Sequence, residues 1–202
     1  MKIYFVRHGE SIANTIWVFS NRGYKHGLTE KGINQVNSCG ESLQLQRFDA
    51  LISSPLKRAV ETAEILSKYL DIPYSIDKSL NEIDVGILED KSDEASKSLF
   101  FEMIDDWVIN KNYSRSIEGG ESLLDAKERF IPFIENLASI YPQSANIAIV
   151  SHATTYCCTL PFLFENVDLK FGAGNVLKNA EYIVGESIDG KYVCKSWGVI
   201  KL

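Results

Sequence analysis

The sequence lacks the features that mark secreted, metal-stapled and membrane-spanning proteins. Its four cysteines show no Cys-x-x-Cys spacing and no secreted-scaffold density, which argues against a zinc site or a disulfide framework and favours reduced thiols. No apolar run approaches the roughly 20 residues that span a bilayer. The first apolar run meets Arg7 and His8 too early for a signal peptide. We therefore expect a cytoplasmic protein without a membrane partner.

An excess of basic charge is also missing. The 202 residues include 21 Lys and Arg against 27 Asp and Glu, which gives a net charge of −6. Nucleic acid and anionic membranes are bound through basic surface stripes, so we expect no nucleic-acid partner. An anionic ligand would have to be held by a local cluster of cations. The chain has no internal repeat or low-complexity tract, and its length suits a single domain over residues 1–202.

Short apolar runs alternate with helical patterns along the chain. Residues 3–6, 50–52 and 147–150 predict buried parallel strands. One helix is expected after Thr29 as its N-cap, and another from Ser54-Pro55. Further helices are predicted from Ser122 toward Tyr141 and over 154–164, followed by a β-hairpin with its tip at 188–190. The predicted fold class is α/β, a three-layer α/β/α arrangement with a mostly parallel central sheet, interrupted by a helical excursion at about 88–118.

Each predicted strand leads directly into a polar segment. The first precedes Arg7-His8, the second precedes a segment that contains Arg58, and the third precedes His152. The carboxyl ends of parallel strands meet at one edge of a sheet, so these side chains are expected to converge. Two imidazoles and two guanidinium groups suit a phosphoryl group. No carboxylate-rich constellation accompanies them, so we expect no metal and no cofactor.

Six motifs occur in a fixed order over nearly the whole chain. They are Arg7-His8-Gly9-Glu10-Ser11 with Asn14; Leu28-Thr29-Glu30-Lys31-Gly32; Ser53-Ser54-Pro55-Leu56-Lys57-Arg58-Ala59-Val60-Glu61-Thr62-Ala63; Leu80-Asn81-Glu82-Ile83-Asp84-Val85-Gly86; Gly119-Gly120-Glu121-Ser122; and Val150-Ser151-His152. In this order and spacing the sequence resembles the histidine phosphatase superfamily, in its phosphoglycerate-mutase-like branch.

The resemblance implies a role for each residue that matches the family motifs. His8 matches the nucleophile that becomes a phosphohistidine. Arg7 and Arg58 match the arginines that grip the phosphoryl oxygens, and His152 matches the second phosphate-binding histidine. Asn14 matches an asparagine that contacts the phosphate.

The resemblance also implies that Glu82 is the acid/base carboxylate that protonates the leaving oxygen. General acid catalysis of this kind contributes about 10²–10⁴ in rate. Ser11 is a candidate donor to the phosphate, and Gly9 and Ala153 are candidate backbone contacts. Ala153 departs from the family, which usually has glycine there; alanine keeps the N–H but disfavours a positive φ.

Phosphoryl transfer to a histidine sets requirements on both imidazoles. His8 must be neutral, with one nitrogen free to attack and the other donating a proton to a fixed acceptor, for which a backbone carbonyl near Gly9 is the candidate. A cationic His152 would add positive charge as negative charge spreads over the phosphoryl oxygens. We therefore predict opposite protonation states for the two side chains.

Several neighbouring residues allow two interpretations. Glu10 is either a substrate contact or a partner of an arginine. His26 favours a solvated loop position, whereas Arg22 and Lys25 would suit a second anionic group on the substrate.

The aromatic residues of the 88–118 segment are expected mainly in the core, with some of them able to roof the pocket. They are Phe100, Phe101, Trp107 and Tyr113. Glu121 and Ser122 follow the Gly119-Gly120 pair as possible substrate contacts.

Three functions are compatible with these residues. The favoured one is a metal-independent phosphatase that hydrolyses a small phosphomonoester, because 202 residues resemble the shorter phosphatases of this branch. The alternative is a cofactor-dependent phosphoglycerate mutase. A catalytically silent phosphate-binding module is disfavoured, since the nucleophile and the acid are both present. The sequence does not name the substrate, and the edge of the C-terminal hairpin offers a surface for a homodimer.

Overall fold

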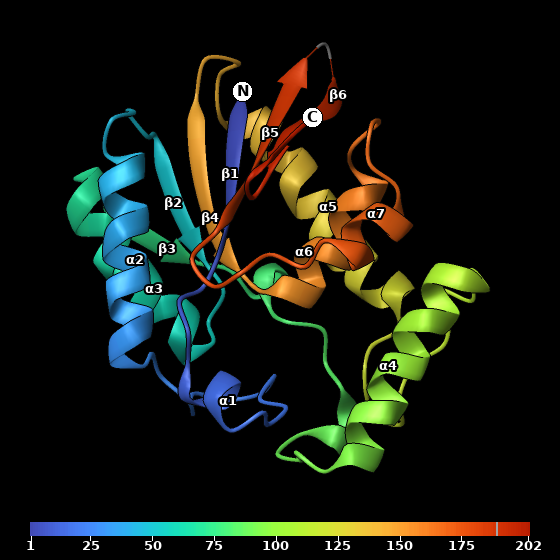
Figure 1. Cartoon of the computed structure of the whole chain (residues 1–202). Helices are drawn as coiled ribbons and strands as arrows, with labels where there is room; N and C mark the ends of the chain where they lie inside the picture. The colour runs from blue at the N-terminus through green and yellow to red at the C-terminus, as the bar shows by residue number, and fades with distance from the viewer. Residues whose placement is uncertain (189) are drawn as a thin grey trace.

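A seven-stranded sheet runs through the centre of the protein in the computed structural model, which describes residues 1–188 and 190–202 (Figure 1). The strand order is β3-β2-β4-β1-β5-β6-β7. The strands are β1 (Lys2–Arg7), β2 (Ala50–Ser53), β3 (Tyr74–Ile76), β4 (Asn146–Ser151), β5 (Tyr182–Ile188), β6 (Lys191–Trp197) and β7 (Ile200–Lys201). The first four in this order pair in parallel, and the last three join antiparallel.

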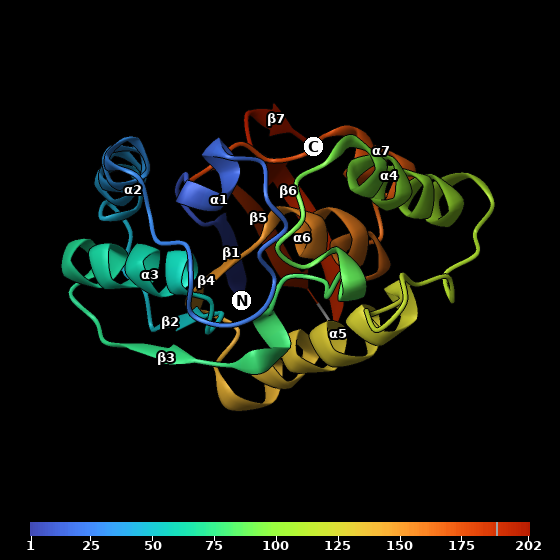
Figure 2. The same cartoon turned by 90° about the horizontal axis from the view of Figure 1, so that it is seen from below.

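Helices cover both faces of this sheet (Figures 1 and 2). They are α1 (Ile12–Thr15), α2 (Glu30–Leu43), α3 (Lys57–Leu70), α4 (Glu94–Ile109), α5 (Leu123–Ile140), α6 (Ala153–Thr159) and α7 (Leu169–Gly174), with 3₁₀ turns at Lys78–Leu80, Gly86–Leu88 and Leu160–Phe162. Tyr4 and Val6 pack with α2 and α3 on one face, while Ile3 and Phe5 pack with α5 and α6 on the other. This alternation follows from the two-residue period of a strand and confirms the predicted three-layer fold.

Two helix boundaries differ from the prediction. The helix expected from Ser54-Pro55 begins only at Lys57, because Leu56 is extended (φ −68°, ψ 136°) and serves as its N-cap. The Ser54 hydroxyl instead lies at the carboxyl edge of the sheet, where it contacts His152. The helix predicted over 154–164 ends as an α-helix at Thr159 and tightens into a 3₁₀ turn that contains Pro161, whose ring nitrogen has no hydrogen to donate.

Only the middle of the predicted excursion at 88–118 is α-helical. Met103 and Trp107 of α4 are fully buried with Leu88, Ile117 and residues of α5 and α6. The Trp107 indole N–H donates to the Arg115 carbonyl oxygen at 2.8 Å. The α4 helix is thus packed onto the main body, and in Figure 2 it lies at the side of the molecule next to α7.

The C-terminal hairpin is confirmed, since β5 and β6 pair antiparallel from Ile183 opposite Trp197 to Ile188 opposite Lys191. Residue 189, at its predicted tip, lies outside the described residues. Within 1–188 and 190–202, no helix combines the length and the apolar character that a membrane span needs.

Candidate active site

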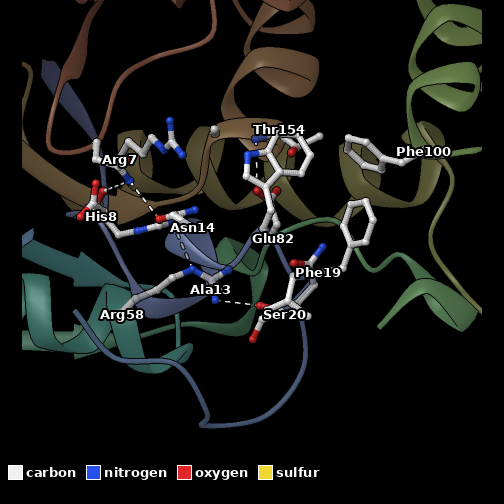
Figure 3. A pocket seen from close by; sticks show the side chains of 16 residues that line it. Arg7, His8, Ala13, Asn14, Phe19, Ser20, Arg58, Glu82, Phe100 and Thr154 are labelled. Carbon is white, nitrogen blue, oxygen red and sulfur yellow. Dashed lines mark hydrogen bonds between the residues drawn. The ribbon is translucent and has the colours of Figure 1, made fainter. Parts of the chain in front are cut away.

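The three sequence segments predicted to converge do so at one pocket of about 420 Å³ at the carboxyl edge of the sheet (Figure 3). β1 and β4 pair in register through Arg7 opposite Ser151, which puts His8 and His152 side by side after neighbouring strands. Their ring centroids lie 5.1 Å apart. Arg58 reaches the same place from the first turn of α3. Arg7, His8, Asn14, Arg58, Glu82 and Ala153 all line this pocket.

His8 is held in one tautomer. Its Nδ1 lies 2.7 Å from the carbonyl oxygen of Gly9, and its Nε2 accepts a hydrogen bond from Arg58 Nε at 3.1 Å. Burial, together with the charges of Arg58 and Arg7, holds the pKa of His8 well below its usual value of 6.5. The Nδ1 therefore carries the proton and the Nε2 lone pair faces the pocket. The predicted neutral state and the predicted acceptor at Gly9 are confirmed.

His152 was predicted to be cationic during phosphoryl transfer, whereas its contacts in the structure favour a neutral imidazole. Its Nδ1 lies 3.2 Å from Arg58 Nη2, a group that can only donate, and its Nε2 lies 2.8 Å from Ser54 Oγ. Burial lowers the pKa of His152 well below 6.5, and Arg58 and His8 lower it further. A neutral imidazole with its proton on Nε2 satisfies both contacts. The full burial of the imidazole, which the sequence does not show, is the main reason for the difference.

Arg58 is the centre of this hydrogen-bond network. Besides the two histidines it reaches the Ser20 carbonyl oxygen through Nη1 at 2.7 Å. The side chain is buried, which lowers the pKa of Arg58 to about 10, so the guanidinium stays cationic at neutral pH. Its three contacts fix the plane of the guanidinium relative to both imidazoles.

Arg7 brings an unused donor to the pocket. Its Nη1 donates to the Leu177 carbonyl oxygen. Its Nε is buried and has no hydrogen-bond partner within residues 1–188 and 190–202. Burial lowers the pKa of Arg7, while the charge of Glu82 opposes that shift. A buried donor without a partner is costly, and the oxygen of an anionic ligand would satisfy it.

Asn14 is positioned by Ser11 and Asn179. The Ser11 N–H and hydroxyl both donate to Asn14 Oδ1 at 3.0 Å, and Asn179 Nδ2 lies 3.3 Å from the same oxygen. With its oxygen occupied, Asn14 can offer only its NH₂ group to the pocket. Ser11 is fully buried and its donors serve Asn14, so the structure does not place it against a ligand.

The two predicted backbone contacts differ. The Gly9 N–H donates to Thr62 Oγ1 at 3.2 Å and does not face the pocket. A Cβ on Gly9 would lie 2.7 Å from the Gly32 carbonyl oxygen, so glycine is required by the close approach of α2. Ala153, in contrast, lines the pocket as the first residue of α6.

Glu82 is buried and its carboxyl is surrounded by donors. Oε2 accepts from the Thr154 N–H at 3.1 Å, and Oε1 accepts from the N–H groups of Thr155 at 2.8 Å and Ile83 at 3.0 Å. The Thr155 hydroxyl lies 2.9 Å from Oε1 and 2.8 Å from the Asn81 carbonyl oxygen. Figure 3 shows Glu82 beside Thr154, away from His8 across the pocket.

The basic residues between Asn14 and Leu28 are paired with acids. Arg22 Nε lies 2.7 Å from Asp84 Oδ2, and Lys25 Nζ contacts Glu89 and Asp90. Glu10 lines the pocket but pairs with Lys31 rather than with an arginine, and the hydrogen bonds from Lys31 and Thr29 lower the pKa of Glu10. His26 does not line the pocket and is half-buried in the loop before Gly27.

The aromatic and acidic candidates divide between core and pocket. Phe100 lines the pocket, together with Trp17 and Phe19 of the loop after α1, whereas Trp107 belongs to the core. Tyr113 packs against Phe162 with ring centroids 5.3 Å apart. Glu121 and Ser122, which were predicted as possible substrate contacts, have structural roles: Ser122 caps α5, and Glu121 binds Arg129 at 2.7 Å.

Sequence reasoning missed the residues that position the predicted ones. Ser54 contacts His152, Ser20 supplies the carbonyl that holds Arg58, and Asn179 contacts both Asn14 Oδ1 and the His8 carbonyl oxygen. Ser54 lies in the motif at residues 53–63, directly after a buried strand, and its polar side chain at that position could have identified it. Ser20 acts through its main chain and Asn179 comes from a distant loop, and neither had a local signal.

Comparison with known proteins agrees with this geometry. The family model of the histidine phosphatase superfamily, branch 1, matches residues 3–200. A protein of Salmonella choleraesuis named "Probable phosphoglycerate mutase GpmB" is 29% identical over 164 residues, which cover 78% of this chain and 72% of that protein.

Solved structures of the same fold include two phosphatases. A mycobacterial glucosyl-3-phosphoglycerate phosphatase aligns with a TM-score of 0.85 and 19% identity over 98% of both chains. The alpha-ribazole phosphatase of Shigella flexneri aligns with a TM-score of 0.81 and 23% identity over 100% of this chain and 98% of that one. At these identities the likeness establishes the fold, and the family match establishes membership: the chain belongs to the histidine phosphatase superfamily, branch 1, and is an enzyme of that type.

Proposed function

We propose that the protein is a metal-independent phosphatase that hydrolyses a small phosphomonoester through a phosphohistidine on His8. The observation that carries this proposal is the tautomer of His8. Its Nδ1–H is directed to the Gly9 carbonyl oxygen, its Nε2 accepts a hydrogen bond from Arg58, and Arg7 lines the same pocket. A neutral imidazole with a fixed proton is a nucleophile ready to attack phosphorus.

In the first step the Nε2 lone pair of His8 forms a bond to phosphorus and the bond from phosphorus to the alcohol oxygen breaks. Arg7, through its unused Nε–H, and Arg58 bind the phosphoryl oxygens, and Asn14 donates from its NH₂ group. These cations stabilise the charge that spreads over the oxygens in a loose transition state. The contact between Arg58 and His8 Nε2 is given up as the phosphoryl group enters.

Glu82 supplies the proton that the departing alkoxide needs. The Thr155 hydroxyl, 2.9 Å from Glu82 Oε1 and 2.8 Å from the Asn81 carbonyl oxygen, holds this carboxyl in place for the transfer. After the alcohol leaves, the carboxylate takes a proton from a water molecule, which attacks phosphorus and breaks the bond to His8. Inorganic phosphate, neutral His8 and protonated Glu82 result, so the cycle closes.

A phosphoglycerate mutase is the second candidate, because curated relatives at 29% identity carry that name. Such an enzyme must bind a substrate with a carboxylate as well as a phosphate. Near this pocket, Arg22 and Lys25 are paired with Asp84, Glu89 and Asp90, which disfavours a second anionic group.

The test is to incubate the purified protein with a panel of phosphomonoesters, including 3-phosphoglycerate, in the presence of EDTA. Free phosphate, product identity and acid-labile phosphoenzyme after rapid quench are measured together. Phosphate release with a phosphoenzyme that His8→Ala lacks is the expected result. Conversion of 3-phosphoglycerate to its 2-isomer without phosphate release would identify a mutase. No turnover and no phosphoenzyme would contradict both functions.

A further inference from the structure

A second cavity, of about 430 Å³, adjoins the phosphate pocket. It lies between α4, α6 and α7, and apolar side chains form most of its wall. Phe100, Ala153 and Thr154 line both cavities, so the two share a wall at these residues. We call this second cavity the apolar annex and define it by Ile104, Val108, Cys157, Cys158, Ala173 and Val176 in addition to those three residues.

We propose that the apolar annex binds the alcohol part of the substrate, and that the preferred substrate is therefore a phosphomonoester of an alcohol with an uncharged, apolar body. This inference rests on the proposed function, because it assumes that a phosphomonoester occupies the site beside His8.

The direction of the leaving group supports this assignment. In an in-line displacement the alcohol oxygen leaves phosphorus on the side opposite His8 Nε2, next to the acid that protonates it. The proposed acid, Glu82, is hydrogen-bonded to the N–H of Thr154, and Thr154 lines the annex. In Figure 3 Glu82 and Thr154 lie between His8 and Phe100. An alcohol that departs past Glu82 thus reaches the annex directly.

The chemistry of the walls supports an apolar alcohol. Ile104, Val108 and Ala173 offer only carbon atoms to a ligand. Cys157 and Cys158 are buried, and burial raises the pKa of Cys157 to about 12, so these thiols behave as small apolar groups. Asp105 and Lys170, the two charged side chains of the wall, are both exposed to solvent. Contact with a hydrocarbon chain would remove apolar surface of both partners from water.

Aromatic side chains continue this wall to the mouth of the phosphate pocket. Phe19 and Phe100 have ring centroids 5.1 Å apart, Phe100 and Phe101 5.6 Å, and Trp17 and Phe101 6.3 Å. Trp17 has a φ of 54°, a left-handed conformation that is rare for a bulky residue. The backbone thus accepts strain at the residue whose indole lines the entrance, which is a common finding at ligand sites.

A polar hollow on the other side of Glu82 is the competing route. It is lined by Arg22, Asp84, Glu121 and Arg129. These four form two ion pairs, Arg22 with Asp84 and Arg129 with Glu121. A charged alcohol in this hollow would meet both ion pairs and Lys78, whereas an apolar one in the annex meets mainly carbon atoms. A preference for charged esters would point to this hollow instead.

The test compares kcat/KM for ethyl, hexyl, 2-phenylethyl and glyceryl phosphates and 3-phosphoglycerate. Ethyl and hexyl phosphate have leaving groups of similar basicity, so a difference between them reports on binding of the chain. The expected result is a hexyl-to-ethyl ratio of kcat/KM of about tenfold or more. A ratio near one, or preference for 3-phosphoglycerate, would overturn the annex assignment while leaving the phosphatase intact. No phosphate from any ester would contradict the proposed function itself.

Variants of α7 and of the segment that follows it locate the effect. Ala173→Leu fills the annex from a residue outside the phosphate pocket, and it is expected to lower the hexyl-to-ethyl ratio about tenfold. Val176→Thr changes a side chain that is 58% exposed, with little risk to folding, and should lower the ratio about threefold. Ala95→Leu is the matched control, an exposed position of α4 outside both cavities, and should not change the ratio. Unchanged ratios in both Ala173→Leu and Val176→Thr would overturn the proposal.

Discussion

The two ends of the pocket are built in different ways. At the phosphate end, His8, Arg58 and His152 are at most 6% exposed and are joined to one another by hydrogen bonds. At the alcohol end, Trp17 and Phe101 are 53% and 51% exposed and their rings contact each other. Hydrogen bonds between buried groups fix orientation, whereas contacts between half-exposed rings allow adjustment.

This difference follows from the elements that supply each end. The phosphate end is attached to β1, β4 and α3, whose register is fixed by the sheet. At the alcohol end, Trp17 and Phe101 come from the loop after α1 and from α4, which lies at the side of the molecule (Figure 2). Substitutions at the phosphate end should therefore change the activity on all substrates. Substitutions at the alcohol end should change the activity on only some of them.

The largest effect is expected for His8→Ala. Removing the nucleophile should lower kcat by at least about 10³-fold for every ester, since no other group can form the covalent intermediate. Steady-state phosphate release measures the loss, and thermal unfolding checks that the variant is folded. Residual activity above a few per cent of wild type would contradict the nucleophile assignment.

Glu82→Gln should separate substrates by leaving group. Alkyl phosphates need a proton on the departing oxygen and are expected to lose about 10²–10⁴ in kcat. Aryl phosphates with an acidic phenol need little protonation and should lose far less. The ratio of the two losses is the measurement, and equal losses would remove Glu82 from the acid role.

Phe100→Ala tests the boundary between the two ends. This side chain lines both cavities, so its removal should lower kcat/KM for hexyl phosphate about tenfold. Inhibition by inorganic phosphate, which occupies only the phosphate end, should change less than about twofold. A matching loss of phosphate affinity would show that the two ends are not independent.

The smallest effect concerns stability against pH at the phosphate end. The folded chain holds the pKa values of His8 and His152 well below 6.5, whereas the unfolded chain protonates both near that value. Below pH 6.5 the unfolded state therefore binds more protons, and the free energy of unfolding falls as the pH is lowered, by up to about 1.4 kcal/mol per pH unit for each group. Above that pH these groups contribute no slope.

Denaturant unfolding at a series of pH values measures this slope. His152→Gln should remove the contribution of one group and make the dependence shallower. An unchanged slope would mean that His152 is already protonated in the folded protein.

The sequence predicted the phosphate end well because its geometry is a consequence of strand order. Apolar runs located β1, β2 and β4, and the polar residues that follow them had to meet at one edge of the sheet. The tautomer of His8 followed from the requirements of a nucleophile. The charge of His152 did not, because the pKa of His152 is lowered first by its own burial and then by the charge of Arg58, and only the packed structure reveals that burial.

The alcohol end was beyond the reach of sequence reasoning. The aromatic spacing in 88–118 was compatible with core and with pocket, and the structure assigns Trp107 to one and Phe100 to the other. The annex depends on how α4 packs against α6 and α7, which are distant in sequence. Similarly, the sequence left Arg22 and Lys25 as candidates for binding a ligand, whereas the structure pairs both with acidic residues.

The hydrogen bonds between Glu82 and α6 have a consequence for redesign. His152 is the N-cap residue of α6, but its side chain makes no capping hydrogen bond. Glu82, from another segment, accepts the N–H groups of Thr154 and Thr155 instead. Glu82, the proposed proton donor, and His152 therefore share one support. If the proposed roles hold, residues of α4 and α7 can be replaced to admit a different alcohol while the position of Glu82 relative to His152 is preserved.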